Sequence, residues 1–445
     1  MMRLKKYFKE IKQYPSAIIG SIMIALLILT AIIVVIAIPY RQAVTYWQGG
    51  SILAENPRNA RPVWQDWLTS QDLTRHQILA TRDNPDFKST TDLNGIREYE
   101  IEFPIDYQYD TFPRELNLFF STNYEESRPR ATVEWITPDG REFEIDSFTI
   151  TDNSNLRIDQ ISDLRREFSG RAPRVGLLAD PDIETPTPLK GEHKLRITGH
   201  LFGENDRLDV RSVVYGQVFG VAGTDHRRRD LGVGLLWGIP VALVFGVLAA
   251  VLTTVIPLII AAIGVWYGGK IDAVIQRLTE VWMIIPLLPL LVLIGMFYSR
   301  SLWVMLAVII IKGLLSAQIK TYRSMFLQVK EEHFIEAAKA YGTSDKRIIF
   351  LYMIPKIIPT TIPNFVIGIP SYVFLEASLA MLGLGDPLLP TWGKILENAW
   401  SQGALYMGQY YWAIQPAVLL MITGLSFAMT GFALDRIFNP RLRRE

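Results

Sequence analysis

Few residues in this sequence lie where they could do covalent chemistry. The chain has no cysteine, which excludes disulfides, thiolate metal sites and a cysteine nucleophile. None of the histidines falls within a long apolar run; they are His76, His193, His200, His226 and His333. This removes a membrane-embedded hydrolase built on a Ser–His pair or on a metal ion. We therefore expect no catalytic residue, no metal site and no cofactor.

One segment imitates a nucleotide-binding motif. Residues 264–270, Gly-Val-Trp-Tyr-Gly-Gly-Lys, fit the first seven positions of a phosphate-binding loop. Ile271 stands where that loop needs a Ser or Thr to hold Mg²⁺, and the segment ends an apolar run rather than a strand. We predict that it does not bind ATP.

Glu376 is the clearest ionisable residue inside an apolar run. A carboxylate in such a position is a functional-site hypothesis by default. Two interpretations stay open for it. Glu376 acts in translocation or proton coupling, or it makes a structural hydrogen bond near the outer end of its run.

A polar stretch between two apolar runs contains a predicted short amphipathic helix. Acidic residues gather at its start, where the helix dipole favours them: Glu331, Glu332 and Glu336. An apolar stripe follows at helical spacing: Phe334, Ala338 and Tyr341. Ala337 and Ala338 allow close approach of a partner, and Gly342 is placed to end the helix. Docking into a groove of another protein and lying at the membrane interface are both open interpretations.

The elements that carry these residues are membrane spans. The chain has 445 residues, of which 49% are hydrophobic and 20% charged, and the charge is segregated from the apolar runs. A spanning helix needs about 20 apolar residues. We predict six spans, at residues 16–39, 241–266, 283–298, 302–318, 359–383 and 413–434. The second carries Pro257 and is predicted to be one tilted or kinked helix.

Basic residues near the ends of these runs predict the orientation. They are Arg3, Lys5, Lys6, Lys9 and Lys12 at the start, and Arg436, Arg441, Arg443 and Arg444 at the end. By the positive-inside rule both termini are cytoplasmic, which requires an even number of spans. Residues 267–282 and 319–358 are then inside and residues 46–230 outside. The net charge of +1 gives no reason to expect nucleic-acid binding.

The large outside segment differs from the rest because it alternates apolar and polar residues. The alternating runs include Tyr99, Ile101 and Phe103; Leu116, Leu118 and Phe120; Val133 and Trp135; Phe143 and Ile145; Leu195 and Ile197. Period two predicts half-buried strands, and residues 137–140, Thr-Pro-Asp-Gly, predict a hairpin. We expect a sandwich-like β domain with short helices at 63–78 and 160–170. Bracing the outer face, docking a delivery protein and contacting the cell envelope stay open as its role.

Residues 336–355 resemble the Glu-Ala-Ala…Gly…Ile-Leu-Pro segment of ABC importer permeases, which docks on the ATPase subunit. Gly342 lies six residues after Glu336, and Pro355 closes the motif after Met-Ile, where the family usually has Ile-Leu. The resemblance implies that the docking residues are Glu336, Ala337, Ala338, Tyr341, Gly342 and Pro355.

Further segments, in the same order, resemble dipeptide and oligopeptide permeases of this family. They are Gly223-Thr224-Asp225 with Arg229-Asp230-Leu231; Tyr267-Gly268-Gly269 with Asp272, Arg277 and Pro286; Glu376-Ala377-Ser378-Leu379 with Leu382-Gly383-Leu384-Gly385; Pro390-Thr391-Trp392-Gly393; and Asp435-Arg436 with Asn439-Pro440-Arg441-Leu442-Arg443. Arg228 stands where the family usually has Gly, which predicts a different local turn. The resemblance covers roughly residues 1–40 and 220–445 and is closest to the C-type subunit; the large outside insert is the main departure.

What the resemblance implies is an all-α polytopic membrane protein of the type I ABC importer permease fold, with an inserted extracytoplasmic β-rich domain. We expect residues 1–45 to hold an N-terminal cytoplasmic segment and the first span, residues 46–222 the β-rich domain, and residues 223–445 the permease core with docking loop 319–358. Implied partners are ABC ATPases, a second permease subunit and an extracytoplasmic substrate-binding protein. The implied activity is ATP-driven, alternating-access import of peptides or similar small solutes across the bacterial cytoplasmic membrane, without enzymatic chemistry in this subunit.

Two other functions compete with this hypothesis. A membrane-anchored sensor or structural protein would use the outer domain as its working part, and residues 331–345 would then tolerate mutation. A secondary transporter would need Glu376 and no ATPase. The substrate and the residues lining its pathway do not follow from this sequence.

Overall fold

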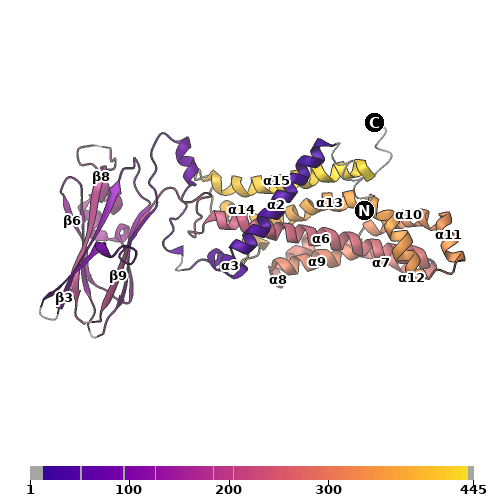
Figure 1. The fold of residues 1–445 in the computed structure, drawn as a ribbon, viewed down its shortest axis with the longest axis horizontal. Coiled ribbons are helices and arrows are strands. Elements are labelled where there is room, and N and C mark those ends of the chain that lie inside the picture. Colours follow the sequence, from indigo (N-terminus) through magenta and orange to yellow (C-terminus); the bar gives the residue numbers. More distant parts are fainter. Residues whose placement is uncertain are drawn as a thin grey trace. The chain divides into compact units, whose positions relative to one another are not determined.

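The computed structural model describes residues 14–50, 53–93, 96–125, 127–183, 185–203 and 205–438. The chain divides into two compact units (Figure 1): Gly49–Gly232, here the β unit, and Met1–Gln48 with Val233–Glu445, here the membrane unit. The basic residues predicted to orient both ends lie outside the described residues, except Arg436, and so does the Asn439–Arg443 part of the C-terminal resemblance.

The described part of the β unit contains two antiparallel sheets. One has the strand order β1-β9-β4-β7 and the other β2-β3-β8-β5-β6. The strands are β1 Gln77–Ala80, β2 Lys88–Leu93, β3 Ile96–Tyr107, β4 Glu115–Asn123, β5 Arg130–Ile136, β6 Glu142–Thr149, β7 Asn153–Arg157, β8 Gly191–Leu201 and β9 Arg207–Tyr215. Helices α4 Ser162–Glu167 and α5 Pro173–Leu178 lie between β7 and β8, preceded by the 3₁₀ turn Ile158–Gln160.

One hydrophobic core joins the two sheets. In β3 every second side chain is buried, from Tyr99 to Tyr107, and these residues pack in the same cluster as Leu118 of β4 and Val210 of β9. The alternation in the sequence therefore predicted the strands correctly, and the two sheets form a sandwich. The predicted hairpin is present, because the amide of Thr137 donates to the carbonyl of Arg141 at 2.9 Å.

The helix expected at residues 63–78 is not there. Only Val63–Leu68 form a 3₁₀ turn, and β1 already begins at Gln77. A local side-chain bond explains the early end: Asp66 Oδ1 accepts the amide of Leu73 at 3.0 Å, which turns the chain back on itself. Asp and Thr side chains commonly compete with helix hydrogen bonds in this way.

The membrane unit is helical throughout its described part. Its first helices are α2 Pro15–Ala37, α3 Tyr40–Gln48, α6 Leu231–Tyr267, α7 Gly269–Ile284, α8 Leu287–Phe297, α9 Leu302–Leu314 and α10 Gln318–Lys330. The rest are α11 His333–Ala340, α12 Asp345–Arg347, α13 Ile354–Leu379, α14 Trp392–Ser401 and α15 Tyr410–Phe438, with π-helical segments at Ile348–Met353 and Ala380–Leu384. As predicted, the Pro257 run is one helix, α6.

The six spans stay a prediction, because the described residues contain four candidate spans, or up to six if each bent helix pair is one span. Among the described residues four helices are long and apolar enough to cross a membrane: Pro15–Ala37, Leu231–Tyr267, Asp345–Leu384 and Tyr410–Phe438. The pairs α7–α8 and α9–α10 reach sufficient length only together, and they bend by 67° and 42°. Residues 267–282, predicted to lie inside between two spans, contain most of helix α7, and Pro286 marks the first bend because helices usually end before proline.

Candidate functional site

Helix α11 ends in a Schellman motif at Gly342. The amide of Gly342 donates to the carbonyl of Lys339 at 2.9 Å, and the amide of Thr343 donates to that of Ala338 at 3.0 Å. Gly342 has a φ of +71°, a left-handed conformation that favours glycine, and a Cβ added there would meet nothing within 4 Å. The sequence-based prediction that Gly342 ends this helix is therefore confirmed.

The two faces of α11 differ from the predicted stripe. Ile335 and Ala338 are buried, and Phe334 is partly buried. Tyr341 is 90% exposed, because it is the C-cap residue and its backbone leaves the helix. The prediction of a Phe334–Ala338–Tyr341 stripe is wrong at Tyr341, and Ala338 packs inward instead of offering a surface to a partner.

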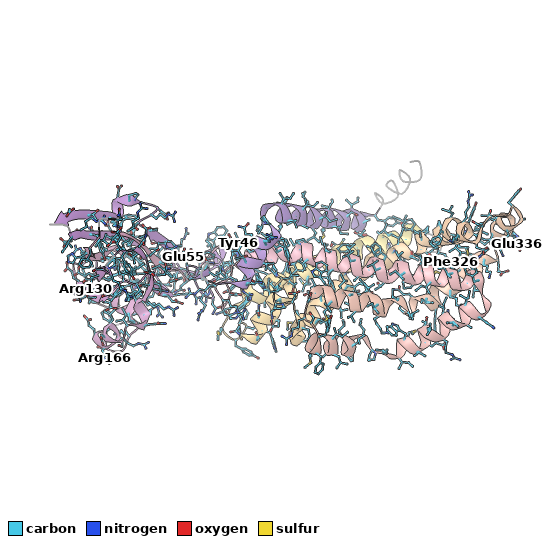
Figure 2. All side chains as sticks on the ribbon, turned by 90° about the horizontal axis from the view of Figure 1, so that it is seen from below. Tyr46, Glu55, Arg130, Arg166, Phe326 and Glu336 are labelled. Atoms are coloured by element: carbon cyan, nitrogen blue, oxygen red, sulfur yellow. The ribbon has the colours of Figure 1, made fainter. Side chains whose placement is uncertain are left out.

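Four of the predicted docking residues form one exposed end of the membrane unit. Glu336, Ala337, Tyr341 and Gly342 are all exposed. Figure 2 shows Glu336 at one end of the membrane unit, beyond Phe326. Pro355 is also exposed but lies in the first turn of α13, directly after the π-helical segment. The surface thus combines an acid, a small residue, an aromatic ring and a tight turn.

Two lysines contact the last turn of α6: Lys330 at the end of α10, and Lys339 of α11. Lys330 Nζ donates to the carbonyls of Val265 and Trp266 at 2.7 and 3.1 Å. These carbonyls lie in the last turn of α6 and have no partner within that helix, so a cation is favoured there. Lys339 of α11 lies over the Trp266 ring, with its Nζ 4.8 Å from the centroid.

The same region has a continuous apolar core and an ion pair at the start of α11. Its buried cluster combines residues of α6, α10, α11, the π-helical segment and α13, such as Val265, Phe326 and Ile335. Lys356 of α13 contacts Glu332 at the start of α11, with Nζ 3.0 Å from the carboxylate oxygen. Displacement of α11 would therefore be carried into three longer helices.

A bidentate ion pair ties α7 to α10. Arg323 Nη2 and Nε lie 2.6 and 2.9 Å from the Asp272 carboxylate oxygens. Sequence reasoning named Asp272 but missed Arg323, Lys330 and Lys339. The sequence pattern that could have indicated Arg323 and Lys330 is their spacing. They lie seven residues apart and therefore share one helix face.

Glu376 lies in a tightly packed junction of α13 and α14. It is 8% exposed, and its side chain is hydrogen-bonded to that of Thr391, the N-cap of α14. A Cβ on Gly393 would come 3.2 Å from Glu376 Oε2 and 2.6 Å from the Ala377 Cα, so the glycine permits this approach. These contacts favour the structural interpretation of Glu376, while a translocation role stays a prediction.

Two further sequence expectations concern turns. Residues 264–270 join α6 to α7, with no strand before them, so their context differs from that of a phosphate-binding loop. Arg228 was expected to change the turn at which the family has Gly. Instead its φ of +66° is the left-handed conformation typical of glycine, held by a 2.6 Å bond from Arg228 Nη1 to the Asn56 carbonyl.

Comparison with known proteins identifies the membrane unit. Residues 244–444 match the family described as binding-protein-dependent transport system inner membrane component. The oligopeptide transport permease OppC of Escherichia coli strain K12 is 31% identical over 225 residues, covering 50% of this chain and 72% of the relative. The OppC protein of Bacillus subtilis strain 168 is 28% identical over 224 residues, covering 50% and 72%. A putative peptide transport permease of Brucella abortus is 30% identical over 229 residues, covering 50% and 74%.

The chain belongs to the binding-protein-dependent transport permeases. It is a multi-pass inner-membrane protein and the membrane-spanning permease subunit of an ABC importer, and this family is one of transport permeases rather than enzymes. The matched range contains α11 and Glu376 but none of the β unit.

Proposed function

We propose that this subunit imports peptides or similar small solutes and is driven by ABC ATPases that dock on α11. The observation that carries the docking proposal is the exposed end formed by Glu336, Ala337, Tyr341 and Gly342, built on a helix whose other face is buried. The peptide proposal is supported by relatives named as oligopeptide and dipeptide permeases.

The proposed mechanism is alternating access. Two ATPases close on ATP and draw together α11 of this subunit and the matching helix of a second permease subunit. The contacts of Lys339 and Lys356 then carry that movement into α6 and α13, and Lys330 connects α6 to α10. An external binding protein delivers the substrate to the pathway between the two permeases. No step requires a covalent reaction in this chain.

Purification of the full-length protein in mild detergent tests this assembly. We expect two ATPase chains and a second, non-identical permease to copurify, and ATP turnover of the complex to rise when a peptide-loaded binding protein is added. The proposal would be contradicted if the protein were recovered without any ATPase from membranes in which ATPases of this type are present. The membrane-anchored sensor would then be the favoured hypothesis. Uptake that a protonophore abolishes while ATP is unchanged would favour the secondary transporter.

The orientation is a further proposal, with both termini and α11 in the cytoplasm and the β unit outside. Its support is the excess of Lys and Arg at the sequence ends and the need of α11 to face ATP. Protease added to intact spheroplasts is expected to cut within residues 49–232 and to spare epitope tags at both termini. A protected β unit, or loss of either tag before the cells are lysed, would reverse the orientation.

A further inference from the structure

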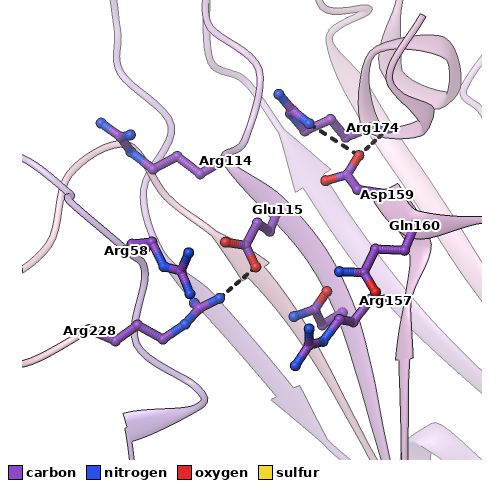
Figure 3. A pocket seen from close by; sticks show the side chains of 9 residues that line it. Arg58, Arg114, Glu115, Arg157, Asp159, Gln160, Arg174 and Arg228 are labelled. Atoms are coloured by element: carbon purple, nitrogen blue, oxygen red, sulfur yellow. Dashed lines mark hydrogen bonds and ion pairs between the residues drawn. The ribbon is translucent and has the colours of Figure 1, made fainter. Parts of the chain in front are cut away.

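The β unit contains a small cavity rich in arginine. Its volume is about 260 Å³. The lining residues come from β4, the end of β7, the segment after it, α5 and the chain before and after the sandwich: Arg58, Arg114, Glu115, Asn117, Arg157, Asp159, Gln160, Arg174 and Arg228. Figure 3 shows Glu115 with Arg58 and Arg228 on one side and Arg157 and Asp159 on the other. All of these residues belong to one compact unit.

The cavity has more positive than negative charge. Two of its arginines are neutralised by its two acids: Arg228 Nη2 lies 2.6 Å from Glu115 Oε2, and Arg174 Nη1 lies 3.3 Å from Asp159 Oδ1. Arg58 and Arg157 make no ion pair with any acid in the part of the chain that the structure describes. Unpaired guanidinium groups converging on a concave surface attract anions, because their field is focused there.

Two groups in the cavity are held in fixed positions. The Arg228 guanidinium is bonded to Glu115 and to the Asn56 carbonyl, and it stacks 4.7 Å from the centre of the Tyr215 ring. Arg174 donates its backbone amide to Asp159 Oδ1 at 3.1 Å. The paired arginines therefore form a rigid frame around the arginines that lack an acidic partner.

The cavity also offers an acceptor. Asp159 Oδ2 is buried without a hydrogen-bond donor among the described residues. Burial raises the pKa of Asp159, although the neighbouring Arg174 opposes this. A ligand that combines negative oxygens with a hydroxyl group would satisfy both the arginines and this oxygen.

We propose that this cavity is a binding site for a small oxyanion, a solute carrying carboxylate or phosphate groups, held mainly by Arg58 and Arg157 within the frame made by Arg174 and Arg228. Guanidinium groups bind both kinds of oxyanion with two parallel hydrogen bonds, which gives geometric fit as well as charge. The cavity volume of about 260 Å³ suits a small solute, and Arg58 and Arg157 are both exposed to solvent. This role is separate from ATPase docking and from the translocation pathway.

Isothermal titration calorimetry of the full-length protein in lipid nanodiscs tests the site. The probes are inorganic phosphate and citrate, which separate the two sources of the oxyanion. We expect one of them to bind with a single site per chain, and the affinity to fall as ionic strength rises. Arg58→Gln and Arg157→Gln are each expected to weaken it about tenfold, since a charge-assisted bond contributes about 1.4 kcal/mol or more.

Arg166→Gln is the matched control, because Arg166 is an arginine of the same unit, 82% exposed, that does not line the cavity. It should bind like the wild type. Neither Arg58 nor Arg157 makes an ion pair among the described residues, so both variants should fold, which circular dichroism would verify. Absence of binding for both probes, or equal affinity of the Arg58→Gln/Arg157→Gln double variant and the control, would refute the site. Intact ATPase copurification in the same variants would keep the proposed function separate from this result.

Discussion

Replacing Gly342 with valine is expected to abolish ATP-coupled uptake while the protein still inserts and folds. Its φ of +71° costs an L-residue about 1–2 kcal/mol, and more for a β-branched side chain. The Schellman bonds from Gly342 and Thr343 would be lost, so the exposed end that holds Tyr341 would move. Since 1.4 kcal/mol is a factor of ten in an equilibrium, we expect ATPase association to weaken at least about tenfold.

Gly408 provides a matched control for this change. Like Gly342 it is exposed, has a φ of +71° and has nothing within 4 Å of an added Cβ. It lies in the turn between α14 and α15. Gly408→Val therefore imposes the same backbone strain away from α11. Gly342→Asn is the second control, because Asn tolerates the left-handed conformation and should keep most of the activity.

The readouts are an ATPase pull-down and substrate-dependent ATP turnover in reconstituted vesicles. Gly342→Val should lose both, whereas Gly408→Val should keep ATPase binding. Glu336→Lys, which places the wrong charge near the helix start and changes the same surface, should resemble Gly342→Val. Wild-type uptake by both Gly342→Val and Glu336→Lys would show that α11 is not the coupling element.

The sequence predicted those features that depend on local patterns. The end of α11 at Gly342 followed from residue type alone, and the sandwich strands followed from strict alternation, as in β3. The sequence did not predict the side of α11 that Tyr341 occupies, because this depends on the backbone leaving the helix at the C-cap. Helical periodicity can place a residue on a face only while the helix continues.

Features that depend on long-range packing were missed for a different reason. Each bent pair joins a more polar helix to an apolar one: α7 to α8, and α10 to α9. A hydropathy pattern separates the two helices of each pair, so it does not predict that they form one unit. The partner of Asp272 is Arg323, 51 residues further along the chain. The partner of Glu376 is Thr391, the N-cap of α14. The cavity in the β unit likewise combines arginines from five separate segments, none of which forms a motif by itself.

Disrupting the Asp272–Arg323 pair is the second change expected to have a large effect. Asp272 and Arg323 are 16% and 35% exposed, and the guanidinium contacts both carboxylate oxygens. We expect a double-mutant cycle with alanine at both positions to give a coupling free energy of about 1–2 kcal/mol, which allows for partial solvent screening. The measurement is unfolding of the purified protein in mixed detergent–SDS micelles.

The matched control is the Arg277–Glu280 pair on the same helix α7. Its side chains are 82% and 47% exposed and its contact is 3.3 Å, so its coupling free energy should be at most about 0.5 kcal/mol. Similar values for the two pairs would contradict the assigned role of Asp272–Arg323.

Exchanging the charges tests what the pair does beyond attraction. Asp272 lies in the first turn of α7, where the helix dipole favours an acid, so Asp272→Arg/Arg323→Asp should recover the ion pair but lose that dipole contribution. We therefore expect partial rescue of stability relative to either single reversal. If the pair transmits movement between α7 and α10, uptake per ATP should fall in Arg323→Ala and rise again in the exchanged variant. If Arg323→Ala lowers stability but leaves uptake per ATP unchanged, the pair stabilises the fold and does not transmit movement.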